Sequence, residues 1–215
     1  MFNNLTPVIR NFLILNVGVF LISNIVMPQD IVIGGGDSLS SVTFYGSAFS
    51  VNSPYFRPYQ IFTSMFIHYG FFHLLMNMLA LSSIGPILES YLKQKRFLML
   101  YMAAGIFGTV LSVLLDYLGV YQMSLAAGAS GAVVGVVACV AFIAPDLPVS
   151  IMFLPFQFKL KQAFIGFLVF DILGAAYIIT GGNTGIGHFA HLGGALTGLF
   201  LMKIWNVNSN SNRWS

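Results

Sequence analysis

Apolar residues gather in six long stretches that polar segments separate. The stretches run over residues 9–27, 70–91, 97–119, 126–144, 162–181 and 185–205. Each is close to the length of about 20 residues that a helix needs to cross the hydrocarbon core of a bilayer. The pattern therefore predicts an all-α membrane protein, with six transmembrane helices in a single membrane domain over residues 1–205.

Two polar segments complete this pattern. Residues 28–68 form the longest polar excursion, which contains Gly34-Gly35-Gly36 and several aromatic residues. We expect this segment to be a large loop that carries short interfacial helices. Residues 206–215 are polar throughout their length apart from two positions, and we expect them to form a tail outside the membrane.

The composition supports the assignment to a membrane. Of the 215 residues, 57% are hydrophobic and 7% are charged, whereas about a quarter of the residues in soluble domains are charged. The net charge of +3 is small and scattered, which argues against a nucleic-acid partner. Cys139 is the one cysteine, so an internal disulfide is excluded. Residues 9–27 lack a cleavage pattern, and we expect them to be retained as a first span.

The basic residues predict the orientation. Arg57 lies in the 28–68 loop, whereas the other eight basic residues flank the opposite ends of the predicted spans. Those eight are Arg10, Lys93, Lys95, Arg96, Lys159, Lys161, Lys203 and Arg213. Because positive charge marks the cytoplasmic side, we expect both termini in the cytoplasm and the 28–68 loop outside.

The three spans that begin at the outer face carry polar residues at a common depth. His73, Ser130 and His191 lie near the starts of the second, fourth and sixth stretches, which corresponds to a depth of roughly 5–10 Å. A serine hydroxyl becomes a nucleophile when a neighbouring base takes its proton, and histidine is a suitable base. His73 and Asn77 are four residues apart and share a helix face. Together with the Ser130 backbone N–H, they could stabilise an oxyanion.

Glycines on two spans predict a close crossing near these polar residues. Gly131 and Gly135 form one GxxxG step, and Gly194 and Gly198 form another. Small residues at this spacing let helix backbones approach each other in a membrane. If these two faces meet, Ser130 and His191 lie at the same end of the crossing.

The motifs around these residues resemble those of a known family. Gly128-Ala129-Ser130-Gly131 followed by Gly135, Ala190-His191 followed by Gly194 and Gly198, and His68 followed by His73 and Asn77 resemble the motifs of rhomboid intramembrane serine proteases. Glu89, at the end of the second stretch, also fits the family. The resemblance covers roughly residues 55–205.

The resemblance implies a site and an activity. Ser130 would be the nucleophile and His191 the general base, in a dyad that lacks an acidic third member. His73, Asn77 and the Ser130 backbone N–H would stabilise the oxyanion, while the glycines, Gly128 included, would pack around the site. The family cleaves peptide bonds in or beside transmembrane segments, from a six-span core with a water-filled cavity. We therefore expect single-span membrane proteins as substrates, a bacterial plasma membrane as location, and no cofactor.

Some residues of this chain differ from those that the family usually has at the same positions. Tyr59-Gln60 replaces a frequent Trp-Arg, and Val134 replaces a tyrosine that often stacks on the histidine. We expect other packing, from Phe189 or His188, to hold His191, although His188 is expected mainly at a rim that faces water.

His68 is expected to hold the first loop. Asp171 is expected to bond to a neighbouring helix, with a role in gating or substrate entry as the alternative, and to have no direct part in catalysis.

Other classes of membrane protein fit the sequence less well. Metalloproteases of this kind need H-E-x-x-H, and His188 and His191 have no glutamate between them. An aspartyl protease needs two carboxylates, and Asp171 is the only one deep in a predicted span. A transporter should show inverted repeats and broken helices, which are not found. A rhomboid-like pseudoprotease, which would bind membrane segments without cleaving them, stays open as the alternative.

Overall fold

The computed structural model describes residues 5–32, 38–123, 125–150 and 156–208. Within them the chain is mostly helical. The Gly34-Gly35-Gly36 segment and most of the predicted tail lie outside the described residues.

The helices follow the apolar stretches. The first, α1 (Pro7–Leu21), continues as a π-helix, η2 (Ile22–Val26). The others are α4 (Phe71–Tyr117), α5 (Ser130–Ile143), α6 (Leu160–Ile179) and α7 (His188–Ile204). At Lys93 the backbone of α4 leaves the helical region (φ 67°, ψ 162°), so α4 consists of two helices joined at a sharp turn. The predicted second and third stretches are its two halves.

The length and composition of three helices support a multi-pass membrane protein. Among the described residues, Pro7–Val26, Phe71–Tyr117 and Leu160–Ile179 are long and apolar enough to cross a bilayer. The outer surface of α6 exposes Ile165, Val169, Ile172 and Leu173, which suits contact with lipid. α5 has 14 residues and is shorter than a full span. The count of six spans therefore stays a prediction.

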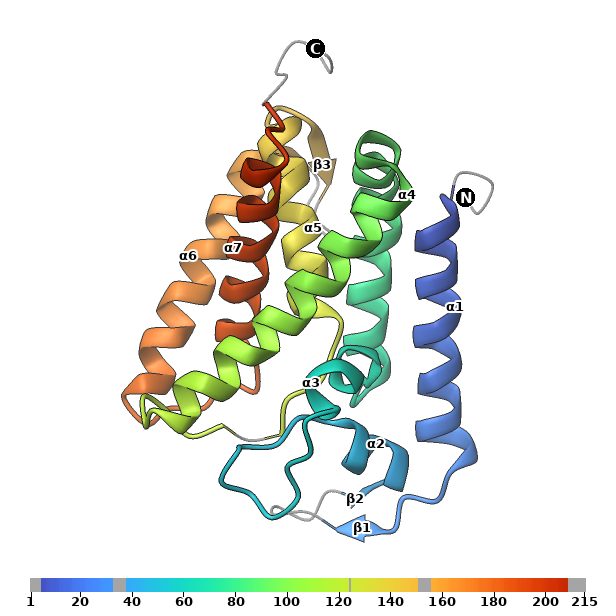
Figure 1. Ribbon diagram of the computed structural model, residues 1–215, viewed down its shortest axis with the longest axis vertical. Coiled ribbons are helices and arrows are strands. Elements are labelled where there is room, and N and C mark those ends of the chain that lie inside the picture. The colour runs from blue at the N-terminus through green and yellow to red at the C-terminus, as the bar shows by residue number, and fades with distance from the viewer. Residues whose placement is uncertain (1–4, 33–37, 124, 151–155, 209–215) are drawn as a thin grey trace.

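The segment before α4 forms a small layer across one end of the helices (Figure 1). It contains β1 (Ile31–Val32) paired antiparallel with β2 (Ser38–Leu39), followed by α2 (Ser41–Gly46), α3 (Gln60–Thr63) and the 3₁₀ helix η3 (Ser64–Phe66). Gln60, at the position where the family often has an arginine, is fully buried. Its amide nitrogen donates to the carbonyl oxygens of Tyr45 (3.2 Å) and Tyr55 (3.1 Å). Gln60 therefore holds this layer together.

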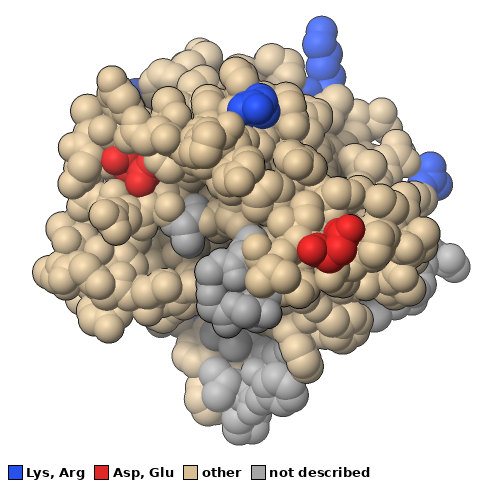
Figure 2. Space-filling model, turned by 90° about the horizontal axis from the view of Figure 1, so that it is seen from below, with Lys and Arg blue, Asp and Glu red and all other residues tan. Residues whose placement is uncertain are grey.

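Both chain ends lie at the opposite end of the bundle, beside the turn in α4 and the hairpin of β3 (Pro148–Ser150) and β4 (Gln157–Lys159) (Figure 1). The basic residues of the described chain are at this end, except for Arg57 in the small layer. Figure 2 shows the face of that layer, which carries only scattered charged side chains. The charge division read from the sequence is thus a division between two ends of the molecule.

Glycines bring α5 and α7 into backbone contact. A Cβ on Gly194 would overlap the carbonyl of Gly131, and a Cβ on Gly198 would lie 2.7 Å from the carbonyl oxygen of Gly135. Such distances leave no room for a side chain. Because both helices begin at the same end of the bundle (Figure 1), this contact sets their first turns side by side. α5 begins at Ser130, four residues after the predicted start.

Candidate active site

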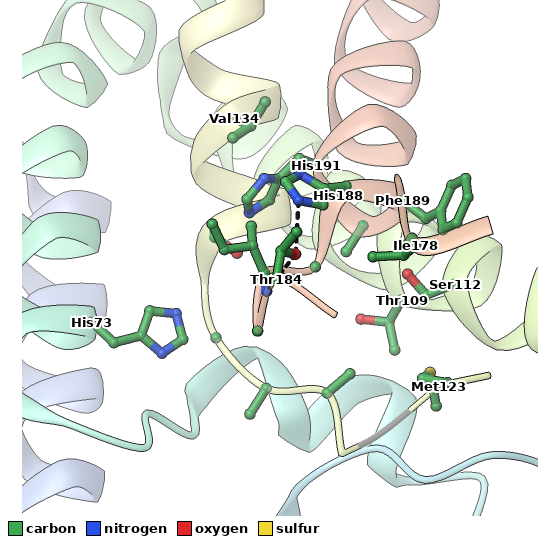
Figure 3. A pocket seen from close by; sticks show the side chains of 18 of the residues that line it. His73, Thr109, Ser112, Met123, Val134, Ile178, Thr184, His188, Phe189 and His191 are labelled. Atoms are coloured by element: carbon green, nitrogen blue, oxygen red, sulfur yellow. Dashed lines mark hydrogen bonds between the residues drawn. The ribbon is translucent and has the colours of Figure 1, made fainter. Parts of the chain in front are cut away.

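A cavity of about 1170 Å³ opens among α4, α5, α6 and α7. The residues predicted to carry the reaction all contribute to its lining: His73, Asn77, Ser130 and His191. In Figure 3, His73 enters from α4 at one side, and His188 and His191 come from α7. Thr109, Ser112 and Thr184 add polar lining that the sequence reasoning did not single out.

The loop before Ser130 is held by two hydrogen bonds. The N–H of Gly128 donates to the carbonyl oxygen of Ser64 (2.8 Å), and the N–H of Ala129 points to Nε2 of His68 (3.5 Å). Burial, with a smaller contribution from His73, lowers the pKa of His68 to about 4. His68 is therefore neutral near pH 7, and its Nε2 can accept a hydrogen bond. This contact agrees with a role for His68 in holding the loop.

Glycine is required at position 128 for two reasons. Its φ of +123° lies in a region that side chains disfavour. A Cβ there would also lie 2.6 Å from Nε2 of His73 and 3.7 Å from Oγ of Ser130. The side chains of His73 and Ser130 thus border the same small space.

The residues predicted to stabilise an oxyanion, His73, Asn77 and Ser130, line the same cavity. Ser130 is the first residue of α5, where helix N–H groups have no partner within the helix and the dipole favours negative charge. The amide nitrogen of Asn77 donates one hydrogen to the carbonyl oxygen of His73 (2.8 Å), which leaves its second hydrogen available. His73 packs edge-on against His68, with ring centroids 5.0 Å apart.

His191 is held by contacts from α6. Its Nδ1 atom lies 3.0 Å from Oδ1 of Asp171, and its ring lies 5.5 Å from that of Phe167. Nε2 is left for the cavity that His191 lines. Within the described part of the chain, His191 and the Ser130 hydroxyl are not joined by a hydrogen bond. Bonds of this kind are often long before substrate binds.

The prediction that His191 lacks a carboxylate partner is wrong, because Asp171 contacts it directly. From the sequence, the depth of Asp171 in the membrane can be counted from the basic end of α6. That count does not show which side chains of α7 Asp171 contacts. The rim position for His188 is also wrong, since this side chain is 1% exposed and contacts Asp171 at 2.7 Å. Phe189 does not hold His191; its ring packs on Tyr121 at 4.9 Å.

A ring still supports His191, although Val134 replaces the usual tyrosine on α5. Phe167 supplies it from α6. The signal for this contact is a spacing in the sequence. Phe167, Phe170, Asp171 and Gly174 recur at i, i+3, i+4 and i+7 and so share one face of α6.

The same cluster contains the atoms that could hold a metal ion. Asp171, His188 and His191 each offer one ligand atom, all within 4.8 Å of one another. Two ligands of one tetrahedral zinc, with bonds of about 2.0–2.1 Å, would be about 3.3 Å apart. The contacts of 2.7 and 3.0 Å to Asp171 are shorter. They suit hydrogen bonds better.

Comparisons with known proteins agree with the motifs. The family model described as "Rhomboid domain" matches residues 55–206. The bovine "Presenilin-associated rhomboid-like protein, mitochondrial" is 36% identical over 166 residues, which is 69% of this chain and 42% of the bovine protein. The yeast (Saccharomyces cerevisiae) "Rhomboid protein 1, mitochondrial" is 34% identical over 143 residues, covering 65% of this chain and 40% of the relative.

A further relative is named as a protease. "Rhomboid-like protease 3" of Toxoplasma gondii is 28% identical over 162 residues, which is 75% of this chain and 57% of the relative. The chain spans about two fifths of the length of the bovine and yeast relatives.

Proposed function

Because the chain belongs to the rhomboid family, we propose that it is an intramembrane serine endopeptidase in which Ser130 is the nucleophile and His191 the general base. The observation that carries this proposal is the meeting of two helix starts. α5 and α7 cross through glycines, and their first turns deliver Ser130 and His191 to one cavity.

The proposed reaction uses the free nitrogen of His191. Nε2 takes the proton of Ser130 as Oγ attacks the carbonyl carbon of the substrate, and an acyl-enzyme follows. His73, Asn77 and the N–H of Ser130 are proposed to stabilise the oxyanion. Removing one such donor typically lowers kcat by about 10²–10³-fold. Water then releases the acyl group, and the reaction needs no cofactor.

The proposed setting is a six-span domain over residues 1–205, with both termini on the cytoplasmic side. The basic residues at the end of the bundle that holds the termini support this orientation. The cavity then opens toward the other side of the membrane. Substrates are proposed to be single-span membrane proteins cut in or beside their transmembrane segment.

The proposed membrane is defined less narrowly than the bacterial plasma membrane expected from the sequence. The prediction of a bacterial plasma membrane finds no support among the relatives, because the bovine and yeast proteins are named as mitochondrial. The proposed location is therefore a cellular membrane, in which the chain is a multi-pass protein.

The alternative is a pseudoprotease that binds membrane segments without cutting them. Both candidate reacting side chains are present and line the cavity, which favours the protease. A pseudoprotease would bind a single-span segment in vesicles but leave it intact in every variant.

Cleavage of a model single-span substrate in lipid vesicles tests the proposal. We expect the wild-type chain to cut it, and Ser130→Ala and His191→Ala to lower kcat by about 10⁴-fold or more. Ser82→Ala is the matched control, because Ser82 bonds within α4 and is not part of the cavity lining. Undiminished cutting by Ser130→Ala would exclude the proposed nucleophile.

A further inference from the structure

Asp171 lies between the two histidines of α7, although the reaction proposed above does not require a carboxylate. It is 0% exposed. Its Oδ1 atom lies 2.7 Å from Nδ1 of His188 and 3.0 Å from Nδ1 of His191. The other oxygen, Oδ2, has no hydrogen-bond partner in the described chain. A buried carboxylate with an unsatisfied oxygen is costly, so the group is expected to have a role besides packing.

Which ring nitrogens of His188 and His191 carry hydrogen follows from the atoms they contact. A carboxylate oxygen only accepts hydrogen bonds, so the Nδ1 atoms of both histidines must carry hydrogen. Each neutral imidazole then has its lone pair on Nε2. Nε2 of His188 lies 2.9 Å from Oγ1 of Thr184, whose hydroxyl can donate to it. Among the described residues Nε2 of His191 has no hydrogen-bond partner, and it is the atom that must accept the proton of Ser130.

One face of α6 is shaped for these two histidines. Its members are Phe167, Phe170, Asp171 and Gly174. The two phenylalanine rings lie 5.5 Å from the ring of His191 and 5.4 Å from that of His188. A Cβ on Gly174 would overlap the ring of His188. The helix that supplies the carboxylate thus also makes room for its second partner.

We infer that Asp171 is a positioning residue, and that the hydrogen-bonded chain Thr184–His188–Asp171–His191 holds His191 with its hydrogen on Nδ1 and its lone pair toward the cavity. The inference rests on the proposed function, since it takes His191 as the base. It replaces a dyad held by packing alone with a base that a buried carboxylate orients.

The carboxylate contributes most when the proton moves. The O–H bond of Ser130 breaks, its proton binds Nε2 of His191, and a bond forms from Oγ to the carbonyl carbon, whose π electron pair moves to oxygen. His191 is then a cation 3.0 Å from Asp171, and charge-assisted hydrogen bonds are about twice as strong as neutral ones. On collapse the proton passes from Nε2 to the leaving nitrogen, which leaves His191 neutral again.

Asp171→Asn tests this role with little change in volume. The amide oxygen can still accept from both Nδ1–H groups, as Oδ1 does now, but the negative charge that would stabilise the His191 cation is gone. We expect kcat in vesicles to fall by about 10²-fold, because the hydrogen bond to the His191 cation no longer has a charged acceptor, while KM is unchanged. Glu89→Gln is the matched control: it makes the same change at another buried carboxylate and should leave kcat of the folded protein unaltered.

A spectroscopic measurement on the wild-type chain does not depend on any variant folding. With ¹⁵N-labelled histidine, NMR of the detergent-solubilised protein should show His188 and His191 with hydrogen on Nδ1. A neutral His191 with hydrogen on Nε2 would overturn the inference, as would wild-type kcat in Asp171→Asn.

The outcomes separate the two proposals. If the wild-type chain cuts, Ser130→Ala does not, and Asp171→Asn cuts at the wild-type rate, the inference about Asp171 fails and the proposed function stands. If Ser130→Ala cuts at the wild-type rate, the proposed function fails regardless of Asp171. A loss in Asp171→Asn that appears only as less folded protein, with kcat per folded molecule unchanged, would also overturn the positioning role.

Discussion

Glu89 and Asp171 are both buried carboxylates, and their hydrogen-bond partners differ in kind. Glu89, on α4, accepts from the hydroxyl of Thr6 and from the N–H groups of Val8 (3.1 Å) and Ile9 (3.0 Å), so that both of its oxygens are used. Asp171 accepts from two imidazoles through one oxygen, and within the described residues its other oxygen is unsatisfied.

The partners of Glu89 explain a structural role. Thr6, Val8 and Ile9 belong to the N-terminal cap and first turn of α1, where N–H groups lack partners within the helix. Pro7 has no N–H to satisfy. Glu89 therefore completes the cap of α1 and fixes that helix to α4.

Burial alone therefore does not identify a functional carboxylate. The backbone donors around Glu89 keep their hydrogens under all ordinary conditions, whereas the imidazoles around Asp171 can gain or lose one. A buried carboxylate bonded to groups that change protonation, beside a cavity that holds a serine, is the one to associate with chemistry.

The greatest loss of activity is expected from replacing His191, with or without the change at Asp171. His191→Ala should lower kcat by about 10⁴-fold or more. The double variant Asp171→Asn/His191→Ala should lose no more than that, because Asp171 acts only through His191. Cleavage rates of the wild type, both single variants and the double variant measure this coupling. Additive losses would place Asp171 in an independent role.

Glu89→Gln should affect stability instead of rate. The new NH₂ faces the donors of α1, so at least one of them loses its acceptor in a buried setting. We expect unfolding free energy to fall by about 3 kcal/mol, with kcat per folded molecule unchanged. Thermal unfolding in detergent, followed by circular dichroism, measures the first quantity. A lower kcat with wild-type stability would erase the distinction between the two carboxylates.

Gly174→Ala should disturb the Asp171 cluster through His188. The added methyl group overlaps the ring of His188, which must shift and draw Asp171 with it. We expect kcat to fall by about 10-fold, or about 1.4 kcal/mol. Gly166→Ala, on the same helix, is the control, because a Cβ there meets nothing within 4 Å. Equal rates for the two variants would show that His188 does not support the site.

Asp146 extends the comparison to an exposed carboxylate, where the weakest effect is expected. Lys161 and Lys159, each 3.0 Å away, lower the pKa of this carboxyl. Because the folded state holds the proton less tightly than the unfolded state, this pairing stabilises above about pH 4, and the contribution is lost as pH falls through the lowered pKa. Water screens an exposed pair.

The corresponding measurement is the melting temperature of Asp146→Asn against that of the wild type. The two curves should differ slightly near pH 6 and converge in acid. A difference that grows as pH falls would mean that the lysines do not stabilise the ionised form of Asp146.

Much of the fold followed from the sequence because membrane helices must be long and apolar. The stretches at 9–27, 162–181 and 185–205 agree closely with α1 and η2, α6 and α7. The predicted start of α5 is four residues early, since Gly128 takes a left-handed conformation that holds residues 126–129 outside the helix. Apolar character alone could not reveal that.

The site was only partly predictable for a physical reason. Ser130, His191 and the glycines could be named because the motifs that contain them are defined by local spacing within single helices. The contact between Asp171 and His191 depends on how far α6 extends past the start of α7, and on the face it turns inward. Counting residues from each helix end gives neither that extension nor that face. The spacing of Phe167, Phe170, Asp171 and Gly174 does.

The assignment of Ser130 as the nucleophile can be checked without a known substrate, by mapping the adduct of a serine-directed fluorophosphonate. The wild-type chain in vesicles is treated with the reagent, digested and analysed by mass spectrometry, with Ser130→Ala treated in parallel. We predict a single modified site, Ser130, that disappears in the variant together with cleavage of a model single-span substrate. An adduct at another residue, or substrate cleavage that persists in Ser130→Ala, would contradict the assignment.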